Sequence, residues 1–526
     1  MFTSRDFGPL TTGITASRPY LVVAALLLAS FVVGLDTRVF AVGIPDLRGP
    51  MRLSFDEASW LSTFANAPQI LISAAVAWLA TVFGVRRVMI PSTLIYAGIS
   101  LVIPMLHGGE TLLVLHSCRA LLLGLFLPAT IMVMFRNLDT KYWLIGIAIY
   151  TLRVPLAQYL GVVLVGIYGD YLGWQWLYWQ DVIFAPIVAT LLIVSAPREE
   201  INRDLLARAD WGGMLLLGSA MMLLYIAFDQ GNRLDWLESG LIISLLVAGG
   251  FLAAAFLINE SFVRHPWAHA SVILSRNIGV GYTIIIAFAC SAAGASIAIP
   301  AYIQNVSGLR PIALSGVYTL CGVFPVLLAT ILAVILQRRI DARLCVIAGF
   351  LAMAMGSLIG SHLTSSWTPW SFIPVLLLQS VGQSFAFFAT VLYLIANSDP
   401  KRSTAVSAYI QVIRIVGVEF AGSLMTTWLR YREQFHSNTL GQTISASSRN
   451  FDNQVMKLQG VLGEGMAGKT LSTLHVVSAV RSQAFTLTYA DSFLISFWFA
   501  VAALFLVACL GAAPYGPLHH RFRHSK

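Results

Sequence analysis

Charge is scarce in this chain. Only 11% of its 526 residues are Asp, Glu, Lys or Arg, whereas 57% are hydrophobic. Soluble domains carry about 25% charged residues, so this composition excludes an ordinary water-soluble protein. The hydrophobic residues form runs of about 20, the length that an α-helix needs to cross a bilayer. The runs are continuous and lack the alternation of β-barrel strands. We therefore expect an all-α polytopic membrane protein.

Cysteine and catalytic patterns are also sparse. The five cysteines lie inside apolar runs without CxxC spacing, so we expect buried small hydrophobic residues and no metal site. No GxxxxGK[ST] loop is present, which argues against pumping driven by nucleotide hydrolysis. No pairing of His with carboxylates or with Ser suggests catalysis, and we interpret His116 as a core histidine. The sequence predicts no enzyme activity and no cofactor.

Fourteen apolar segments have the length of a spanning helix. We expect spans near 20–44, 58–82, 88–107, 111–134, 143–168, 176–196, 211–229, 239–258, 277–303, 312–336, 343–361, 371–396, 404–429 and 491–513. Polar breaks at 197–210 and 259–277 divide them into six, two and six spans. Matched helical bundles with a binding site between them are common in secondary transporters.

This 6 + 2 + 6 plan predicts the following parts: an N-terminal segment 1–19, a six-helix bundle 20–196, a two-helix insertion with its loops 197–276, a second six-helix bundle 277–513, and a basic tail 514–526. The N-terminal apolar run is too long for a cleaved signal and lacks its small-residue site, so we expect the first span to be retained.

The positive net charge of +9 follows membrane topology and does not indicate nucleic-acid binding. The termini and the alternate short loops on their side hold nineteen Lys and Arg, against four in the short loops opposite. The positive-inside rule therefore predicts that both termini are cytoplasmic. Segment 430–490 then lies outside, where Phe451, Val455 and Leu458 recur at helical spacing and predict one or two amphipathic helices.

Two opposite charges lie at matching depth inside the spans, where a charged residue costs about 2.5–3.5 kcal/mol. Asp36, in LDTRVFAVGIP, is about eight residues, or roughly 12 Å, from the outer end of the first span, and Arg119 has a similar depth in the fourth. The two could form a static structural pair or a proton-linked pair. Arg38 points about 200° away from Asp36, and we expect it to extend to the outer interface.

Other charges need partners on neighbouring helices. Arg153 lies about ten residues from the inner end of the fifth span, deep enough for a cavity or a substrate charge. Arg414 and Glu419 lie about 140° apart in span 13, and Glu419 is either a second proton carrier or the structural partner of an arginine. Asp181 lies within about 9 Å of the outer end of span 6, which predicts a solvated interfacial carboxylate.

Polar side chains in or near span ends complete a candidate substrate cavity, although each could instead form a hydrogen bond between helices. They are Gln158, Tyr302, Gln304, Gln379 and Gln383.

Several stretches match known transporter motifs. LDTRVFAVGIP is similar to the first-span motif LDxTIVNVALP, with Asp36 at its acidic position. RALLLGLFLP is similar to the RxxQG motif, with Arg119 at the arginine. The stretches DQGNRLDW at 229–236 and IPAYIQNVSG at 299–308 also match, as does IRIVGVEFAGS, with Arg414 at the arginine of its motif.

Two further motifs are incomplete. The loop after span 2 is similar to GxLADRxGR and keeps Gly84, Arg86 and Arg87, while Thr81 replaces its aspartate. Span 5 contains GVVLVG, similar to the antiporter motif GPxLGG, in which Val162 replaces the proline. The glycines retained there are Gly161 and Gly166.

In their order along nearly the whole chain, these motifs resemble the fourteen-span EmrB/QacA branch of the major facilitator superfamily, the drug:proton antiporters. The resemblance implies proton-coupled efflux of hydrophobic or aromatic small molecules across a bacterial inner membrane. Asp36 would be the proton-linked group and Arg119 its partner, while Glu419, Arg153 and Arg414 would line or shape the cavity. The segment beginning RYREQFH resembles that of EmrB-type pumps, which implies a periplasmic membrane-fusion adaptor and an outer-membrane channel as candidate partners.

Two alternatives stay open at this point. One is a symporter or uniporter of the same fold for a metabolite or an organic anion, since four arginines against three acids lie inside the spans. The other is a sensor or scaffold without transport, which the replacements at Thr81 and Val162 would permit.

Overall fold

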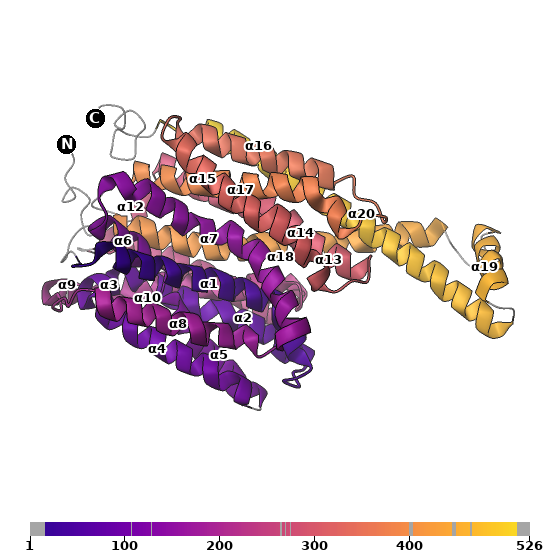
Figure 1. Ribbon diagram of the computed structural model, residues 1–526, viewed down its shortest axis with the longest axis horizontal. Helices are drawn as coiled ribbons and strands as arrows, with labels where there is room; N and C mark the ends of the chain where they lie inside the picture. Colours follow the sequence, from indigo (N-terminus) through magenta and orange to yellow (C-terminus); the bar gives the residue numbers. More distant parts are fainter. Residues whose placement is uncertain are drawn as a thin grey trace.

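The computed structural model describes residues 16–106, 108–127, 129–263, 266–268, 270–273, 275–398, 403–443, 449–462 and 465–512. The expected basic tail 514–526 and residues 1–15 of the expected N-terminal segment lie outside these ranges. Within them the regular secondary structure is entirely helical (Figure 1).

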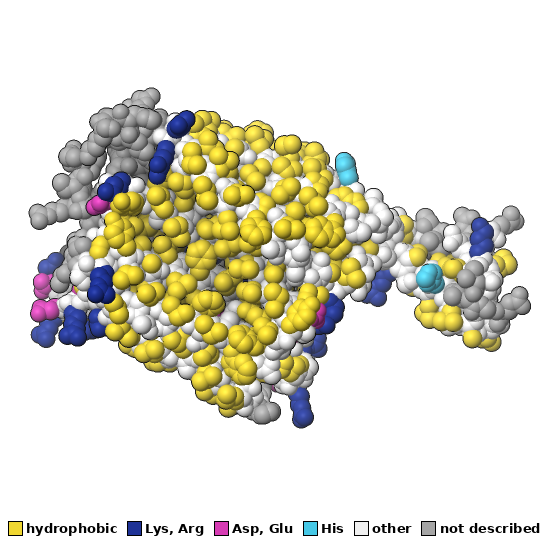
Figure 2. Space-filling view, viewed as in Figure 1, with side chains coloured by type: hydrophobic (Ala, Val, Ile, Leu, Met, Phe, Trp, Pro, Cys, Tyr) yellow, Lys and Arg dark blue, Asp and Glu magenta, His cyan; other side chains and the backbone are white. Residues whose placement is uncertain are grey.

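Among the described residues, thirteen helices are long and apolar enough to cross a membrane, and a bent pair gives a fourteenth if it is counted as one span. The pair is α2 (Phe55–Ser73) and α3 (Val76–Phe83), which meet at 52°. The all-α, fourteen-span fold is therefore confirmed. Hydrophobic side chains cover the middle of the bundle, and charged side chains gather toward its ends, as expected of a multi-pass membrane protein (Figure 2).

The first six spans form one group of packed helices. Its members are α1 (Pro19–Arg48), the α2–α3 pair, α4 (Val85–Val102), α5 (Gly109–Gly124) continued by α6 (Ala129–Asn137), α7 (Thr140–Ile167) and α8 (Trp176–Ser195). Helix α1 packs on α7 and α8, α2 packs on α5, and α4 packs on α8. These contacts place α1, α4, α5 and α8 around one shared interior.

The two inserted spans pack on each other, and one of them makes most of their contacts with the rest of the bundle. They are α10 (Trp211–Gly231) and α11 (Gly240–Phe262), and the short α9 (Arg203–Ala207) precedes them. Helix α10 contacts α2 and α18, whereas α11 exposes large apolar residues such as Val247 and Phe251. Those exposed residues suit a helix that faces lipid.

The last six spans form the second group. After the short α12 (Ala270–Ile273) come α13 (Arg276–Asn305), α14 (Ser315–Tyr318) with a π-helical turn and α15 (Phe324–Gln337), α16 (Ala342–Gly360), α17 (Ile373–Asn397), α18 (Ser403–Thr443) and α20 (Met466–Ala508). Helices α15 and α17 pack against α7, so the two groups meet along α7.

Helices α18 and α20 continue well beyond the spans predicted at 404–429 and 491–513, so these two helices are longer than their apolar spans. Hydropathy detects only the apolar part of a helix that leaves the membrane. Together with α19 (Arg449–Leu462), they form a hairpin that projects from the bundle, and the expectation of helices in 430–490 is confirmed (Figure 1). We call the bundle end nearest this hairpin the hairpin end, and the opposite end, where α1 begins and α20 finishes, the termini end.

The expectation of five buried cysteines was partly wrong. Cys290, Cys321 and Cys345 are buried, whereas Cys118 and Cys509 are exposed. An apolar helix surface that faces lipid has the same hydropathy as one that faces the core, so the sequence pattern does not separate the two.

Candidate functional site

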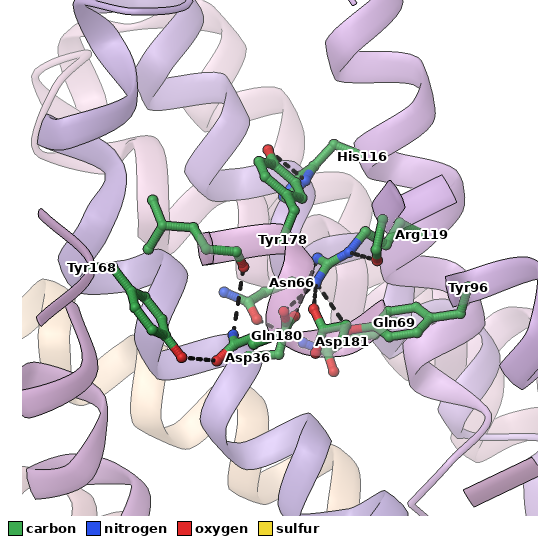
Figure 3. Close-up of polar contacts among 12 residues, drawn as sticks. Asp36, Asn66, Gln69, Tyr96, His116, Arg119, Tyr168, Tyr178, Gln180 and Asp181 are labelled. Carbon is green, nitrogen blue, oxygen red and sulfur yellow. Dashed lines mark hydrogen bonds and ion pairs between the residues drawn. The ribbon is translucent and has the colours of Figure 1, made fainter. Parts of the chain in front are cut away.

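Arg119 of α5 is the centre of a charged cluster buried inside the first helix group (Figure 3). Its Nη2 donates hydrogen bonds to Asp36 of α1 and to Asp181 of α8, and its Nη1 donates to Oδ2 of Asp36 at 3.3 Å. All three side chains are at most 2% exposed. The structure thus contains the Asp36–Arg119 contact suggested by matching depth, and it adds a second carboxylate.

Neutral groups complete the surroundings of this guanidinium. Nε of Arg119 donates to Ser100 Oγ at 2.8 Å, and Nη2 also donates to the hydroxyl of Tyr96 at 2.9 Å. The guanidinium carbon lies 4.8 Å from the ring centres of both Phe40 and Tyr96 and 5.3 Å from that of Tyr178. A buried cation is tolerated when hydrogen bonds, counter-charges and aromatic faces replace its hydration shell, as they do here.

The cluster contains two carboxylates and one guanidinium. With both acids ionised its formal charge is −1, and one bound proton brings it to neutrality. The solvated interfacial position expected for Asp181 was wrong, because the first turns of α8 are buried: Tyr178 and Gln180 are at most 4% exposed, and Gln180 accepts a hydrogen bond from Tyr168 at 3.1 Å. The depth of Asp181, close to that of Asp36 from the same end, was the signal that could have placed it in the cluster.

His116 lies next to this cluster, as a buried residue of α5. Its Nδ1 is 3.4 Å from the hydroxyl of Tyr178, and its ring packs edge-on against Phe40. Its Nε2 has no hydrogen-bond partner. His116 is therefore a core histidine, as expected, with one ring nitrogen unsatisfied.

Arg38 leaves α1 on the side opposite to Asp36, toward the second helix group. Its Nη2 donates to the carbonyl of Ser296 on α13 at 3.2 Å, so the extension to the outer interface predicted for Arg38 was wrong. The side chain crosses α7 at Gly161, where an added Cβ would lie 2.6 Å from Arg38 Cγ. The glycine is what lets Arg38 reach the boundary between the groups.

A small cavity of about 10 Å³ adjoins Arg38, with room for about one water molecule. The first group contributes Arg38, Gln158 and Tyr159 to its wall, and the second contributes Ala295, Ser296, Tyr318, Leu376 and Gln383. Toward the hairpin end the groups also approach closely at Gly166, where a Cβ would lie 3.0 Å from the Cα of Ile312. The boundary is therefore closed around Arg38.

Residues 26–422 match the family described as Major Facilitator Superfamily. This chain belongs to the major facilitator superfamily. It is 26% identical to the probable multidrug resistance protein EmrY of Escherichia coli (strain K12), over 87% of this chain and 90% of that protein. It is 22% identical to the multidrug export protein EmrB of Haemophilus influenzae, over 98% of this chain and 99% of that protein. A crystal structure of a D-xylose-proton symporter, 14% identical, has a TM-score of 0.56 over 94% of this chain and 99% of that one and shares the fold.

In this superfamily member, Arg153 of α7 and Arg414 of α18 are the other two arginines that the sequence predicts deep inside a span. Arg153 is 1% exposed, and among the described residues the side chain of Tyr150 is the one neutral polar group with which its guanidinium interacts. The ring of Tyr150 lies 4.6 Å from the guanidinium carbon. Arg414 is partly buried and donates through Nη2 to Gln411 at 3.4 Å.

Three other candidate cavity residues lie away from the wall around Arg38. Tyr302 donates through its hydroxyl to the carbonyl of Thr364 at 2.8 Å, and Gln379 donates to the carbonyl of Met353 at 3.2 Å. Gln304 is exposed. The first two bind backbone elsewhere in the second group, so the structure brings only Gln158 and Gln383 of the five candidates to the cavity.

Glu419 of α18 faces the inserted helix α10 and not an arginine. It interacts with the hydroxyl of Tyr225 and lies within electrostatic range of Asp229, both on α10. Asp229 in turn accepts hydrogen bonds from Thr63 of α2 and from its neighbour Gln230. A second polar cluster with two carboxylates therefore joins α2, α10 and α18.

The loop motif of the superfamily connects α3 to α4 at the termini end. Gly84 has φ of +84°, a backbone conformation that favours glycine. Arg86 donates to the carbonyls of Ile193 and Ala196 at 2.9 and 3.1 Å, which satisfies the end of α8. Arg87 lines an adjacent surface groove.

Glu199 supplies a carboxylate close to this loop, which lacks the motif's aspartate at Thr81. Glu199 pairs with Arg136, at the end of α6, at 2.7 Å, and both side chains are at most 9% exposed. A Cβ at Gly84 would lie 3.0 Å from the Cβ of Glu199. The segment after α8 thus contributes an acid to the same end of the bundle from a different point in the sequence.

Proposed function

We propose that this superfamily member exports hydrophobic or aromatic small molecules in exchange for protons, by alternating access of a site between its two helix groups. The observation that carries the proposal is the single guanidinium of Arg119 held between Asp36 and Asp181. A static ion pair needs only one acid. A second acid gives a buried cluster that can bind and release a proton while Arg119 keeps a counter-charge.

Helix α1 offers a physical connection from this cluster to the site between the groups. Asp36 contacts Arg119 on one side of α1, and two residues later Arg38 reaches α13 from the other side. Proton binding at the cluster weakens the attraction between Asp36 and Arg119, which lets α1 shift against α5 and α8. The same shift moves Arg38 at the boundary between the groups, so protonation and opening are linked.

Glu419 is proposed as a second proton carrier. Its interaction with Tyr225 and its proximity to Asp229 place two carboxylates, again, among helices from different parts of the chain. Both Asp36 and Glu419 would then contribute to the number of protons exchanged.

The names of the relatives and the distribution of charge support the proposed direction of transport and the proposed membrane. The similar proteins EmrB and EmrY are named as multidrug export and resistance proteins, and the match to EmrB spans almost the whole chain. The excess of Lys and Arg at the termini end supports a cytoplasmic position for that end. We therefore propose a bacterial inner-membrane protein with the hairpin outside.

Transport in proteoliposomes tests the proposal. The probes are 1-pyrenebutyrate, 1-pyrenebutanol and 1-pyrenemethylammonium, which share one aromatic body and differ in charge; protein-free vesicles give the passive leak. Wild-type protein should accumulate at least one probe under an imposed pH gradient, and Asp36→Asn should abolish accumulation while preserving exchange without a gradient. Asp235→Asn, at an exposed ion pair with Arg430, is the matched control and should behave as wild type. Accumulation by Asp36→Asn equal to that of wild type would refute proton coupling through this cluster.

The hairpin is proposed as the contact for a periplasmic membrane-fusion adaptor, which would in turn engage an outer-membrane channel. Its position beyond the bundle and the exposed apolar residues Leu471, Leu474 and Val477, each 52–60% exposed, support this role (Figure 1). Changing these three residues to Ser should abolish crosslinking to the adaptor and leave probe transport in proteoliposomes intact. Undiminished crosslinking would refute the contact.

A further inference from the structure

Arg153 is a buried cation without a counter-charge. It is 1% exposed and lies on α7, the helix along which the two groups meet. Within the part of the chain that the structure describes, its electrostatic surroundings contain no carboxylate, and no hydrogen bond of normal geometry reaches its guanidinium nitrogens. Tyr150, one turn away, is the one neutral polar side chain that interacts with it, and its ring centre lies 4.6 Å from the guanidinium carbon. The charge therefore lacks the counter-charge and most of the hydrogen bonds that a buried cation needs.

A second cation from the opposite group faces the same place. Arg414 of α18 lies close enough to Arg153 for the two charges to repel each other, and it too interacts with Tyr150. No carboxylate contributes to its surroundings among the described residues, and its Nε has no hydrogen-bond partner. Two guanidinium groups, from α7 and α18, therefore lie within electrostatic range of each other and have no carboxylate among their described neighbours.

The comparison with Arg119 shows that this arrangement is not a general property of buried arginines in the chain. Arg119 has two carboxylates, two hydroxyl partners and three aromatic rings. Arg153, equally buried, has only the side chain of Tyr150 among the described residues. Guanidinium pairs are suited to planar carboxylates because each group can donate two parallel hydrogen bonds. The missing partner of Arg153 and Arg414 is therefore an anion that the described part of the chain does not supply.

An aromatic ring interacts with both charges. The ring of Tyr150 lies 4.6 Å from the guanidinium carbon of Arg153, interacts with Arg414 as well, and belongs to the apolar core of the bundle. A small inorganic anion would leave this ring unused. The surroundings fit a molecule with one anionic group and an apolar body.

We infer that Arg153 and Arg414 hold the anionic group of an amphipathic organic anion, a carboxylate with an apolar body, between the two helix groups. This inference names the substrate class of the proposed exporter and rests on that proposed function. Arg38 adds a third positive charge closer to the hairpin end. Gly34 of α1 lies against Arg153, and Arg38 is one turn beyond Gly34, about 6 Å closer to the hairpin end. An anion released from Arg153 and Arg414 would meet Arg38 next on its way out.

Equilibrium binding to the purified full-length protein tests the inference without a proton gradient. The probes are 1-pyrenebutyrate and the neutral 1-pyrenebutanol, followed by pyrene fluorescence in detergent. Wild-type protein should bind the carboxylate at least about tenfold more tightly than the alcohol, which corresponds to about 1.4 kcal/mol. Arg153→Gln and Arg414→Gln should each reduce this preference to about twofold or less and leave binding of the alcohol within about threefold. Arg153→Lys should keep a preference, because it keeps the charge.

Arg430→Gln is the matched control, since Arg430 lies on the same helix as Arg414 but is 47% exposed at the hairpin end, and it should retain the full preference. Equal binding of the two probes by wild type, or an unchanged preference in Arg153→Gln and Arg414→Gln, would overturn the inference. If Arg153→Gln does not yield monodisperse protein, Arg414→Gln and Arg153→Lys decide the question. This experiment measures only the preference for the carboxylate and does not depend on proton coupling. Asp36→Asn should leave the preference unaffected. The anion site and the proton-coupled function can therefore fail separately.

Discussion

Replacing Asp181 by Asn removes the surplus carboxylate of the buried cluster without removing the ion pair between Asp36 and Arg119. The amide oxygen of Asn can still accept the hydrogen bond from Arg119 Nη2, and Asp36 still neutralises the guanidinium. We therefore expect the variant to fold, with a loss of stability of no more than about 1–2 kcal/mol. In this variant the cluster has one carboxylate and one guanidinium and is already neutral when no proton is bound. Proton exchange through the cluster should therefore stop.

The expected accumulation of the probe follows from the free energy that the pH gradient supplies. If one proton is exchanged for each uncharged substrate molecule, a gradient of one pH unit supplies about 1.4 kcal/mol and supports about tenfold accumulation. In proteoliposomes with this gradient, wild-type protein should reach about tenfold accumulation of the uncharged 1-pyrenebutanol if that probe is transported. Asp181→Asn should stay near onefold, with probe exchange across the membrane still measurable in the absence of a gradient. Tenfold accumulation by Asp181→Asn would refute the role given to the second carboxylate.

Arg119→Gln provides the opposite perturbation. It leaves two buried carboxylates without a cation, and loss of one partner from a buried ion pair costs about 3–5 kcal/mol. The melting temperature in detergent should therefore fall much further for Arg119→Gln than for Asp181→Asn. The triple variant Asp36→Asn, Arg119→Gln, Asp181→Asn has no buried charge in the cluster and should recover most of that stability. A triple variant as unstable as Arg119→Gln would show that shape and not charge holds these helices together.

Three further predictions test other parts of the bundle. Gly161→Ala places a Cβ 2.6 Å from Arg38 Cγ and should lower transport several-fold in a well-folded protein; unchanged transport would separate Arg38 from the transport path. Glu199→Gln should lower the melting temperature by removing the charge that pairs with Arg136, equivalent to about 1–3 kcal/mol, and an added Arg136→Gln should restore part of it; no change in either would show that the pair is dispensable. Glu419→Gln should reduce the steepness with which accumulation depends on the pH gradient, and an unaltered dependence would assign Glu419 to packing.

The number of spans and the fold follow from the sequence because they depend on the length of apolar runs, which a bilayer about 30 Å thick fixes directly. The length of an apolar run does not give the end of a helix that continues outside the membrane. Helix α18 runs to Thr443 and α20 starts at Met466, and the parts beyond the apolar runs are held together by contacts such as Arg432 with Asp491 at 2.6 Å. Those contacts join residues far apart in sequence, so hydropathy carries no trace of them.

The depth of a charged residue in its span and the direction that its side chain faces depend on different information. Depth can be counted from the end of a span, and counting placed Asp36 and Arg119 at a common level where the structure joins them. Direction depends on which helices surround a residue. The rotation of about 200° between Asp36 and Arg38 was computable, but what each side of α1 faces was not. One side meets α5 and α8, and the other meets the second helix group.

The same distinction explains why span charges that look alike in sequence have unlike partners. Arg119 and Arg153 each lie well inside an apolar span, yet Arg119 has two carboxylate partners and Arg153 has none among the described residues. Asp181 was placed at an interface because its depth was measured along one helix, whereas its burial comes from α1 and α5 packed beside α8. A charge inside a membrane protein therefore becomes interpretable only when its neighbours on other helices are known. We therefore interpret Arg119, which has carboxylate partners, as part of the proposed proton-binding site. We interpret Arg153, which lacks a counter-charge among the described residues, as part of the proposed anion site.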